Sequence, residues 1–410
     1  MKTRLTSIAL GMLLSSWFLM GCGTEKQDSL TNGDNKKPDS SIGSDDNSNG
    51  SNSNGTNGDN SNGSTGDNSN GSTGDNSNGS NGDVSTTSPY TRKSLISDVM
   101  SDPVFGDYGR LLFPVQRSYW SGTTLESLRL TYYNYIDPDE TVAIVNYLHN
   151  QAKDKQTIFF DIYTDAEKAA DPRKRDTGLF FFRANGRNAS NASRQASNAS
   201  SKASNASRQA SNASRQAAPA KARFAVCNAG GAFAFVGAMH DSFPHALELS
   251  KKGYNAFALI YRPGAQTACE DLARAISFIF SHADELGVNT DCYSLWGGSA
   301  GGRMAAWVSG YGTAAFGGDN LPKAGAAIIQ YTGLSDYSKD DVATYACVGS
   351  SDGIANWRTM QARLAGLSSL GIPTEFHVYE GLPHGFGLGK GTVAEGWIND
   401  AVKFWEKQMK

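Results

Sequence analysis

The chain has 410 residues, of which 39% are hydrophobic, and its formal net charge is −3. This length leaves room for more than one domain. The charge is uneven, because residues 27–88 hold nine Asp and two Lys, whereas residues 187–217 hold five Arg or Lys and no acidic residue. Neither segment interleaves basic with aromatic residues, so we expect no nucleic-acid partner.

The first residues have the pattern of an export signal. Met1-Lys2-Thr3-Arg4 is basic, and residues 8–20 are mostly apolar but too few to span a membrane. The run ends at Leu19-Met20-Gly21-Cys22, which resembles the lipobox of bacterial lipoproteins. That resemblance implies a signal peptide over residues 1–21 and a lipid on Cys22. The lipid would anchor an exported protein to the bacterial cell membrane, at its extracellular face or on the cell surface. An ordinary secreted protein with a chance cysteine is the alternative.

Residues 22–88 are expected to form a disordered tether behind the lipidated cysteine. From residue 27 on they are nearly all Asn, Ser, Gly, Asp and Thr, and an octad that starts at Asn60 repeats at Asn68. With so few apolar side chains, the segment cannot offset the entropy lost on ordering. As a flexible coil its root-mean-square reach is roughly 45 Å.

Residues 89–155 are expected to form a partly helical N-terminal extension. Asp137-Pro138-Asp139-Glu140 predicts a helix start, with a capping residue, a proline in the first turn and acidic side chains near the positive end of the helix dipole. An aromatic-rich stretch precedes it, containing Tyr119, Trp120, Tyr132, Tyr133 and Tyr135. Such side chains can stack on a sugar or shape an acyl pocket, but we expect them to pack the extension onto the core. The sequence leaves open whether the extension forms a lid.

Residues 156–410 have the pattern of an α/β domain. Apolar, strand-like runs are found at Thr157–Tyr163, Gly178–Arg183, Arg223–Cys227, Asn255–Tyr261, Cys292–Trp296, Ala326–Tyr331, Val342–Val348 and Thr374–Tyr379. Helical patterns are found at Phe243–Lys251, Ala268–Leu286, Ala300–Ser309, Asn356–Ser369 and Val393–Lys407. Continuous apolar strands that alternate with helices predict a mostly parallel, eight-stranded sheet with helices on both faces.

A low-complexity insert at residues 187–217 interrupts this domain. From Asn191 to Ala217 the chain repeats Asn-Ala-Ser-Arg-Gln-Ala-Ser every seven residues, with one variant unit. The alanines form a heptad stripe, but Asn and Ser are poor helix formers. We expect a surface loop that is disordered or transiently helical, and contact of this basic loop with an acidic cell envelope is the alternative.

Four cysteines remain once Cys22 is assigned to the lipid, namely Cys227, Cys269, Cys292 and Cys347. An even number in an exported protein permits disulfides. Three of them lie in apolar, strand-like runs, where a small buried thiol is sufficient explanation. No pair has metal-ligand spacing, so we expect free thiols and no metal site.

Residues 297–301 read Gly-Gly-Ser-Ala-Gly, between an apolar run and the small-residue start of a helix. A serine in this context is typical of a nucleophile elbow, a sharp turn that exposes the hydroxyl above a sheet. Glycines at 297 and 301 are needed because the turn strains the backbone and leaves no room for side chains. We therefore predict that Ser299 is a catalytic nucleophile.

A serine hydroxyl needs a histidine to take its proton and a carboxylate to orient that histidine. Of the two histidines after Ser299, His377 lies inside a predicted strand, whereas His384 follows the last strand in a glycine-rich loop. Catalytic residues sit in such loops at the carboxyl ends of parallel strands. The corresponding loop after the preceding strand contains Asp352. We predict His384 and Asp352, with Asp336 and Asp340-Asp341 as rival acids and a helix cap as the alternative role of Asp352.

The oxyanion that develops during acyl transfer needs two backbone N–H donors. One is expected from Ala300, the residue after the nucleophile. The other is expected from Gly231 or Ala232, in the loop that follows the strand Arg223–Cys227. An ordinary glycine turn between strand and helix is the alternative reading of that loop.

Residues from about 156 to 408 resemble the α/β-hydrolase fold, and within it the bacterial acetyl-ester and carbohydrate-ester hydrolases. The resemblance rests on Gly230-Gly231-Ala232-Phe233, Gly253-Tyr254, Tyr261-Arg262, Gly297-Gly298-Ser299-Ala300-Gly301-Gly302, Asp352 and Pro383-His384-Gly385-Phe386. It implies hydrolysis of short acyl esters, often acetyl groups on plant saccharides, without a cofactor. The chain departs from the His-Gly-Gly-Gly form of the oxyanion loop, with Ala229 in place of the His and Ala232 in place of the third Gly.

We therefore expect a cell-surface serine esterase that cleaves short-chain acyl esters, acetyl esters above all, through an acyl-enzyme. Its partners would be a small acyl ester or acylated saccharide and, through the lipid, the membrane. A serine peptidase of the same fold is an alternative, although residues 90–155 are too short for the large additional domain that such peptidases usually carry. A catalytically inactive surface-binding protein is a second alternative, against which the intact Ser299, Asp352 and His384 argue. The acyl group, the alcohol and the oligomeric state do not follow from the sequence.

Overall fold

The computed structural model describes residues 89–113, 122–130, 133, 136–185 and 221–409. The contacts divide the chain into Met1–Asn81 and Gly82–Lys410, and every described residue belongs to the second unit. The predicted signal peptide, Cys22, the tether and the repeats of the insert lie outside the described residues. Those predictions, and the predicted domain boundaries, stay predictions.

The described part of the N-terminal extension contains two α-helices and two 3₁₀ helices. They are α1 (Ile96–Ser101), η1 (Pro103–Leu112), η2 (Leu125–Ser127) and α2 (Pro138–Lys153). Helix α2 begins where the sequence predicts, since the Asp137 side chain accepts hydrogen bonds from the N–H groups of Asp139 and Glu140 at 2.9 and 3.4 Å. Its buried face includes Ile144, Val145 and Leu148, so the helix is fixed by packing as well as by its cap.

All eight predicted strands are present. They are β1 (Phe159–Asp161), β2 (Gly178–Phe182), β3 (Ala222–Asn228), β4 (Asn255–Ile260), β5 (Val288–Gly298), β6 (Ala326–Gln330), β7 (Thr344–Gly349) and β8 (Thr374–Tyr379). They form one sheet in the order β1-β2-β4-β3-β5-β6-β7-β8. In this order, all neighbours from β4 through β3 and β5 to β8 are parallel. The pairings of β1 with β2 and of β2 with β4 are antiparallel. The mostly parallel sheet of the α/β-hydrolase fold is thus confirmed.

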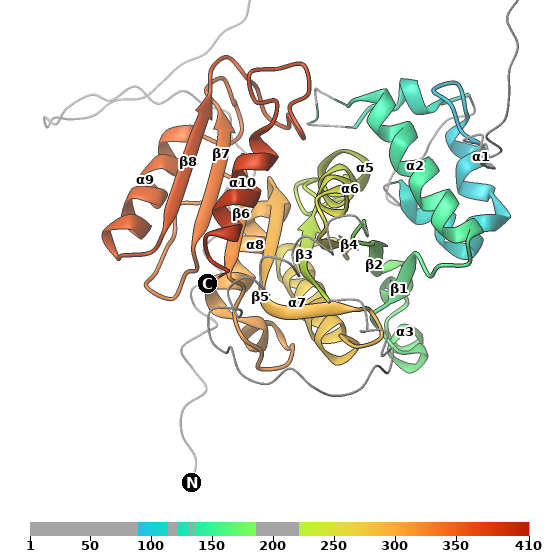
Figure 1. The fold of residues 1–410 in the computed structure, drawn as a ribbon, viewed down its shortest axis with the longest axis horizontal. Coiled ribbons are helices and arrows are strands. Elements are labelled where there is room, and N and C mark those ends of the chain that lie inside the picture. Colours follow the sequence, from blue (N-terminus) through green and yellow to red (C-terminus); the bar gives the residue numbers. More distant parts are fainter. Residues whose placement is uncertain (1–88, 114–121, 131–132, 134–135, 186–220, 410) are drawn as a thin grey trace, which may run out of the picture. The chain divides into compact units, whose positions relative to one another are not determined.

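Helices cover both faces of the sheet (Figure 1). They include α3 (Asp165–Ala170), α5 (Ala238–Asp241), α6 (Phe243–Lys251), α7 (Ala265–Ser281), α8 (Ala300–Tyr311), α9 (Trp357–Ser369) and α10 (Trp397–Glu406), with the 3₁₀ helices η3 (Pro172–Asp176) and η4 (Thr313–Phe316). Helix α6 packs beside α10, where the rings of His245 and Trp397 lie 5.5 Å apart. Helices α7 and α8 also pack against each other.

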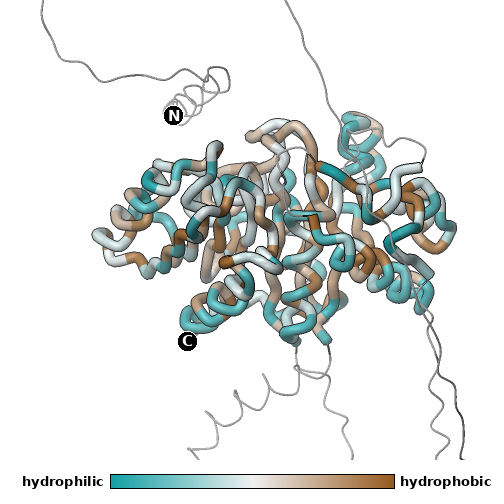
Figure 2. Tube along the Cα trace, turned by 90° about the horizontal axis from the view of Figure 1, so that it is seen from above, coloured by the Kyte–Doolittle hydropathy of each residue, from teal (hydrophilic) through white to brown (hydrophobic). Residues whose placement is uncertain are grey.

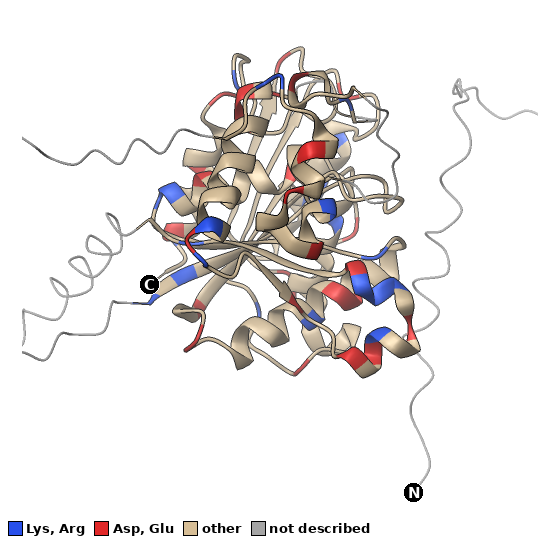
Figure 3. Ribbon diagram, turned by 90° about the vertical axis from the view of Figure 1, so that its right-hand side faces the viewer, with Lys and Arg blue, Asp and Glu red and all other residues tan. Residues whose placement is uncertain are grey.

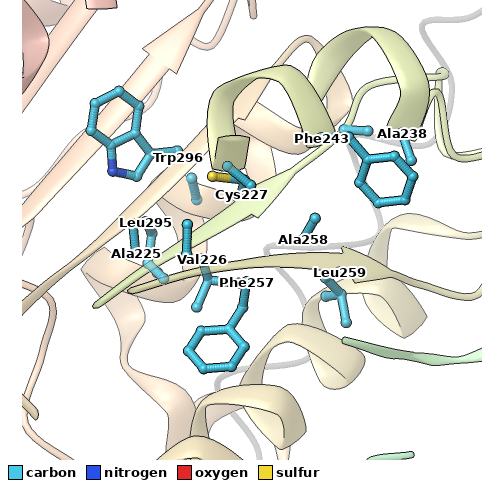
Figure 4. Packing of buried hydrophobic residues seen from close by; sticks show 14 of the residues in the cluster. Ala225, Val226, Cys227, Ala238, Phe243, Phe257, Ala258, Leu259, Leu295 and Trp296 are labelled. Atoms are coloured by element: carbon cyan, nitrogen blue, oxygen red, sulfur yellow. The ribbon is translucent and has the colours of Figure 1, made fainter. Parts of the chain in front are cut away.

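The core lies where the central strands meet these helices. Every residue of β2, β4, β6 and β7 is buried, as expected for strands covered on both faces. Apolar side chains of β3, β4 and β5 interdigitate (Figure 4), and the hydrophobic residues of the trace lie towards its interior (Figure 2). A fully buried Leu or Phe contributes about 1.5–3 kcal/mol, so this core supplies the rigid frame for the loops above it.

Charged residues of both signs are distributed over the outer helices and loops (Figure 3). Many of them pair at the surface, as Arg92 does with Asp139 at 2.5 Å. Such exposed pairs contribute about 0–1 kcal/mol each, so they do not decide the fold. Among the described helices, none is both long and apolar enough to cross a membrane.

Several local features differ from the sequence prediction, among them the last helix, which begins at Trp397 and not at Val393 because Gly396 at φ 88° sets its start. Helix α7 begins at Ala265 and ends at Ser281, not at residues 268 and 286, because Gly264 at φ 104° sets its start. Helix α5 was not predicted, since four residues are too few for a periodic pattern. Strand β5 begins at Val288, four residues before the predicted run, and has a register shift in its pairing with β3.

The four cysteines of the described region are free thiols, as predicted. Cys227, Cys269 and Cys347 are buried, whereas Cys292 is only half-buried. Burial raises the pKa of the Cys347 thiol well above its usual value, which keeps it protonated and unreactive.

Candidate active site

The turn between β5 and α8 has the geometry of a nucleophile elbow. Ser299 lies in the left-handed region at φ 52° and ψ −118°, which is strained for a residue with a side chain. Its backbone is held there, since its N–H donates to the Gln330 carbonyl (2.9 Å) and its carbonyl accepts from the Thr332 hydroxyl (2.7 Å). A Cβ on Gly301 would lie 2.7 Å from the Ala229 carbonyl oxygen, so the helix start must be glycine to sit this close to β3.

The three residues predicted to work together are hydrogen-bonded in series. His384 Nε2 lies 3.1 Å from Ser299 Oγ, and His384 Nδ1 lies 2.8 and 3.1 Å from the two carboxylate oxygens of Asp352. The side chains of His384 and Asp352 are 5% and 0% exposed. A hydrogen bond in such a dry site is electrostatically stronger than it is in water, so the imidazole is firmly oriented.

Asp352 is held by its own loop as well as by His384. Its Oδ1 accepts the backbone N–H groups of Ile354 at 2.8 Å and Ala355 at 2.7 Å. The cap of α9 is another residue, Asn356, whose side chain accepts from the N–H of Arg358. Asp352 is therefore not the cap of that helix, and its carboxylate is pre-positioned for the histidine.

The rival residues have other partners. The His377 side chain, on β8, lies 2.9 Å from Glu375 Oε1. Asp336 accepts from the Trp307 indole at 3.3 Å, and Asp341 pairs with Arg363 at 2.7 Å. The backbone carbonyl of Asp340 accepts a hydrogen bond from the Lys323 ammonium at 2.7 Å. In the described part of the chain, only Asp352 among these acids is bonded to His384.

The loop after β3 lies against the elbow in an unusual backbone conformation. Gly231 has φ 129°, and Ala232 and Phe233 both lie in the left-handed region at φ 56° and 57°. A Cβ on Gly230 would be 2.9 Å from the Cβ of Ser299, which places this loop directly beside the nucleophile. The N–H of Gly230 is already used, because it donates to the Asp241 carboxylate at 2.8 Å. The N–H groups of Gly231 and Ala232 come next in this loop, and their role as oxyanion donors stays a prediction.

Ala300 is the first residue of α8 and is 4% exposed. The first N–H groups of a helix have no partner inside the helix, and the helix dipole is positive at that end. The twelve-residue helix therefore presents a donor next to Ser299 for a negatively charged oxygen.

A buried polar cluster behind the elbow was not found by sequence reasoning. It consists of Asp241 on α5, Tyr331 after β6 and Tyr133 of the N-terminal extension, and it is joined by hydrogen bonds to the Asp241 carboxylate. The sequence feature that could have indicated this cluster is the pair of titratable residues His240-Asp241 within a run of small and apolar residues. Tyr133 packs on the His240 ring at 4.5 Å, in line with the expected packing role; the other predicted aromatics, Tyr119, Trp120, Tyr132 and Tyr135, lie outside the described residues.

No cluster of three or more His, Cys, Asp or Glu side chains in the described region could hold a metal ion. The arrangement itself, a strained serine bonded to a histidine that is bonded to a buried carboxylate, is that of a serine hydrolase.

Comparison with known proteins agrees with this assignment of the fold. Residues 214–342 match the model of the family described as BD-FAE, which confirms the predicted resemblance for that segment. No curated protein matches the sequence.

Solved structures with a similar chain path include three bacterial enzymes. An acetyl ester-xyloside bifunctional hydrolase from Caldicellulosiruptor lactoaceticus is 16% identical (TM-score 0.44), over 61% of this chain and 95% of that one. The carboxylesterase Cest-2923 from Lactobacillus plantarum is 17% identical (TM-score 0.42), over 48% of this chain and 90% of that one. The propionate-bound esterase Est2 from Thermogutta terrifontis is 18% identical (TM-score 0.40), over 57% of this chain and 89% of that one.

Proposed function

We propose that this protein is a serine esterase that hydrolyses short-chain acyl esters, with acetyl esters of saccharides as its main substrate class. The observation that carries the proposal is the hydrogen-bonded series Ser299–His384–Asp352 on a strained elbow. The motifs that resemble acetyl-ester and carbohydrate-ester hydrolases support the substrate class, and the match of residues 214–342 to a family model supports the hydrolase fold.

The proposed reaction proceeds through an acyl-enzyme. Ser299 Oγ attacks the ester carbonyl while His384 Nε2 takes its proton, and Asp352 stabilises the imidazolium. The negatively charged oxygen of the tetrahedral intermediate accepts hydrogen bonds from the N–H of Ala300 and of Gly231 or Ala232. The C–O bond to the alcohol then breaks, and the alcohol leaves with the proton of His384. Water attacks the acyl-enzyme by the same steps and releases the carboxylic acid.

Protein atoms close the side of the site that faces Gly230. A Cβ on Gly230 would lie 2.6 Å from the Tyr133 hydroxyl and 2.9 Å from Ser299 Cβ, so protein atoms fill this side of the site. Tyr133 and Asp241 are both buried at this point. A long acyl chain would have to leave the site in another direction.

Purified protein should release p-nitrophenol from p-nitrophenyl acetate and acetate from acetylated xylan, with less activity as the acyl chain grows. Ser299→Ala should lower kcat by about 10⁴-fold or more, because the nucleophile is lost and only oxyanion binding remains. A fluorophosphonate probe should label Ser299 in the parent protein alone. Full activity of Ser299→Ala would refute the proposal, faster cleavage of peptides than of esters would favour the peptidase, and an unlabelled Ser299 would favour the inactive binding protein.

The location of the enzyme is part of the same proposal. We propose that Cys22 carries the lipid and that residues 22–88 hold the enzyme at a distance from the membrane, within reach of extracellular polymers. Cells that express the full chain should incorporate radiolabelled palmitate into the protein and retain it in the membrane fraction. Cys22→Ser should abolish both, and retention of the label in that variant would refute the anchor.

A further inference from the structure

A second buried carboxylate, that of Asp241, lies behind the nucleophile elbow. Asp241 is 1% exposed, and among the described residues it forms no ion pair with Lys or Arg. Its partners are three neutral donors, namely the N–H of Gly230 at 2.8 Å, the hydroxyl of Tyr133 at 3.2 Å and the hydroxyl of Tyr331. A buried charge is tolerated only when it is satisfied in this way, so the three donors are fixed in direction by the carboxylate.

The Asp241 carboxylate fills the space between the oxyanion loop and the elbow. A Cβ on Gly230 would meet the Tyr133 hydroxyl, one Asp241 oxygen at 2.9 Å and Ser299 Cβ at 2.9 Å. A Cβ on Gly298, the residue before the nucleophile, would collide with both Asp241 oxygens and with the Tyr331 ring. Glycine is therefore required on both sides, because the carboxylate occupies the volume where side chains would be.

This contact lies at the start of the oxyanion loop. The Gly230 N–H donates to Asp241, and the three residues that follow, Gly231, Ala232 and Phe233, have positive φ angles. Ala232 and Phe233 are strained there and need a surrounding structure that holds them. The Gly230–Asp241 hydrogen bond lies directly before that strained segment.

The same carboxylate is connected to the histidine loop. Tyr331 donates to Asp241, accepts the N–H of Gly387 at 3.3 Å, and packs its ring edge-on against His384 with the centroids 5.0 Å apart. Tyr331 itself has a positive φ of 33°. One buried group thus contacts the loops of the oxyanion donors and, through Tyr331, of the catalytic histidine.

We propose that Asp241 is the positioning residue that holds the oxyanion loop and the His384 loop in register with Ser299, and that Tyr133 of the N-terminal extension completes this arrangement. The inference rests on the proposed function, since it assigns the support of that reaction. It predicts that the extension contributes to rate and is not only a covering of the core.

The test is Asp241→Asn, which keeps the size of the side chain and removes its charge. An asparagine cannot accept all three hydrogen bonds in the same directions, because one carboxylate oxygen becomes a donor. We expect kcat for p-nitrophenyl acetate to fall roughly 10- to 100-fold, as when an oxyanion donor is misplaced, with KM within about twofold. The inhibition constant of a trifluoromethyl ketone, whose adduct with Ser299 carries the oxyanion, should rise in parallel with the loss in kcat/KM.

The matched control is Asp341→Asn, which also removes a largely buried carboxylate, the one that precedes β7 and pairs with Arg363. It should lower the free energy of unfolding and leave kcat, KM and the inhibition constant of the ketone unchanged. All rates are given per active enzyme, and the active fraction is the fraction of protein that a fluorophosphonate has labelled when the reaction is complete. Equal kinetics for the two variants, both measured well below their melting temperatures, would overturn the proposal.

Tyr133→Phe decides the matter should Asp241→Asn fail to fold. It removes one hydroxyl and keeps the ring on His240, so kcat should fall severalfold at unchanged KM. Where Asp241→Asn does fold, the double variant should lose less in log kcat than the two single variants lose together, because both changes act through one group. A Tyr133→Phe enzyme with parental kcat would refute the role of the extension. Failure of the parent protein to react with the fluorophosphonate would instead refute the proposed function.

Discussion

Strand β7 has a buried carboxylate before it and another after it, and the two are held in different ways. Asp341, before the strand, pairs at 2.7 Å with the guanidinium of Arg363 on α9. Asp352, after the strand, has no Lys or Arg partner among the described residues and bonds instead to the His384 imidazole and to two backbone N–H groups. A carboxylate neutralised by arginine stabilises structure, whereas one aimed at a neutral imidazole favours the imidazolium that forms only during reaction.

The comparison predicts that the carboxylate after β7 affects rate and the one before it affects stability. Asp352→Asn should lower kcat about 10⁴-fold, as expected when a triad acid no longer orients its histidine. The Asn side chain can still accept the N–H groups of Ile354 and Ala355, so the melting temperature should change by a few degrees at most. Steady-state kinetics and thermal unfolding of the same samples check both values. A loss of less than tenfold in kcat would remove Asp352 from the triad.

Asp341→Asn should show the opposite pattern. Arg363 is 2% exposed, so loss of its partner leaves an uncompensated buried charge and should lower the free energy of unfolding by about 3–5 kcal/mol. Urea unfolding measures this change. The double variant Asp341→Asn, Arg363→Met removes both charges and should recover part of the loss. If the double variant is as unstable as the single one, the ion pair is not the cause.

The sequence was sufficient for features that depend on local pattern. Eight apolar runs became eight strands, because a strand buried on both faces needs an unbroken apolar run. The order serine, acid, histidine, each after a strand, was enough to select Ser299, Asp352 and His384, which the structure brings together. Helix ends were less well predicted, as α7 shows, because a single glycine conformation can set them.

The sequence was insufficient where residues far apart in the chain meet. Tyr133 and Asp241 are separated by 108 positions, and no spacing rule connects them. The left-handed backbone of Ala232 and Phe233 was equally hidden, since neither residue type favours it and only the surrounding contacts impose it. Such long-range contacts hold the loop beside Ser299, so the backbone shape of that loop is the part of the candidate site that sequence reasoning describes least.

Histidines extend the comparison and give the smallest predicted effect. His384 lies between the Ser299 hydroxyl and the Asp352 carboxylate, whereas His245 on α6 is 3% exposed and packs against Trp397. Burial lowers the pKa of His245 to about 4 from its usual 6.5, so between these values the unfolded chain binds a proton that the folded one does not. The free energy of unfolding should therefore be constant above about pH 7.5 and fall as the pH drops towards 4, by up to about 3 kcal/mol from this residue. Urea unfolding at pH 7.5, 6 and 5 should show that slope, and His245→Leu should flatten it without changing kcat at pH 7.5. An unchanged slope in His245→Leu would show that the acid sensitivity originates elsewhere, for example at His240, whose pKa burial also lowers.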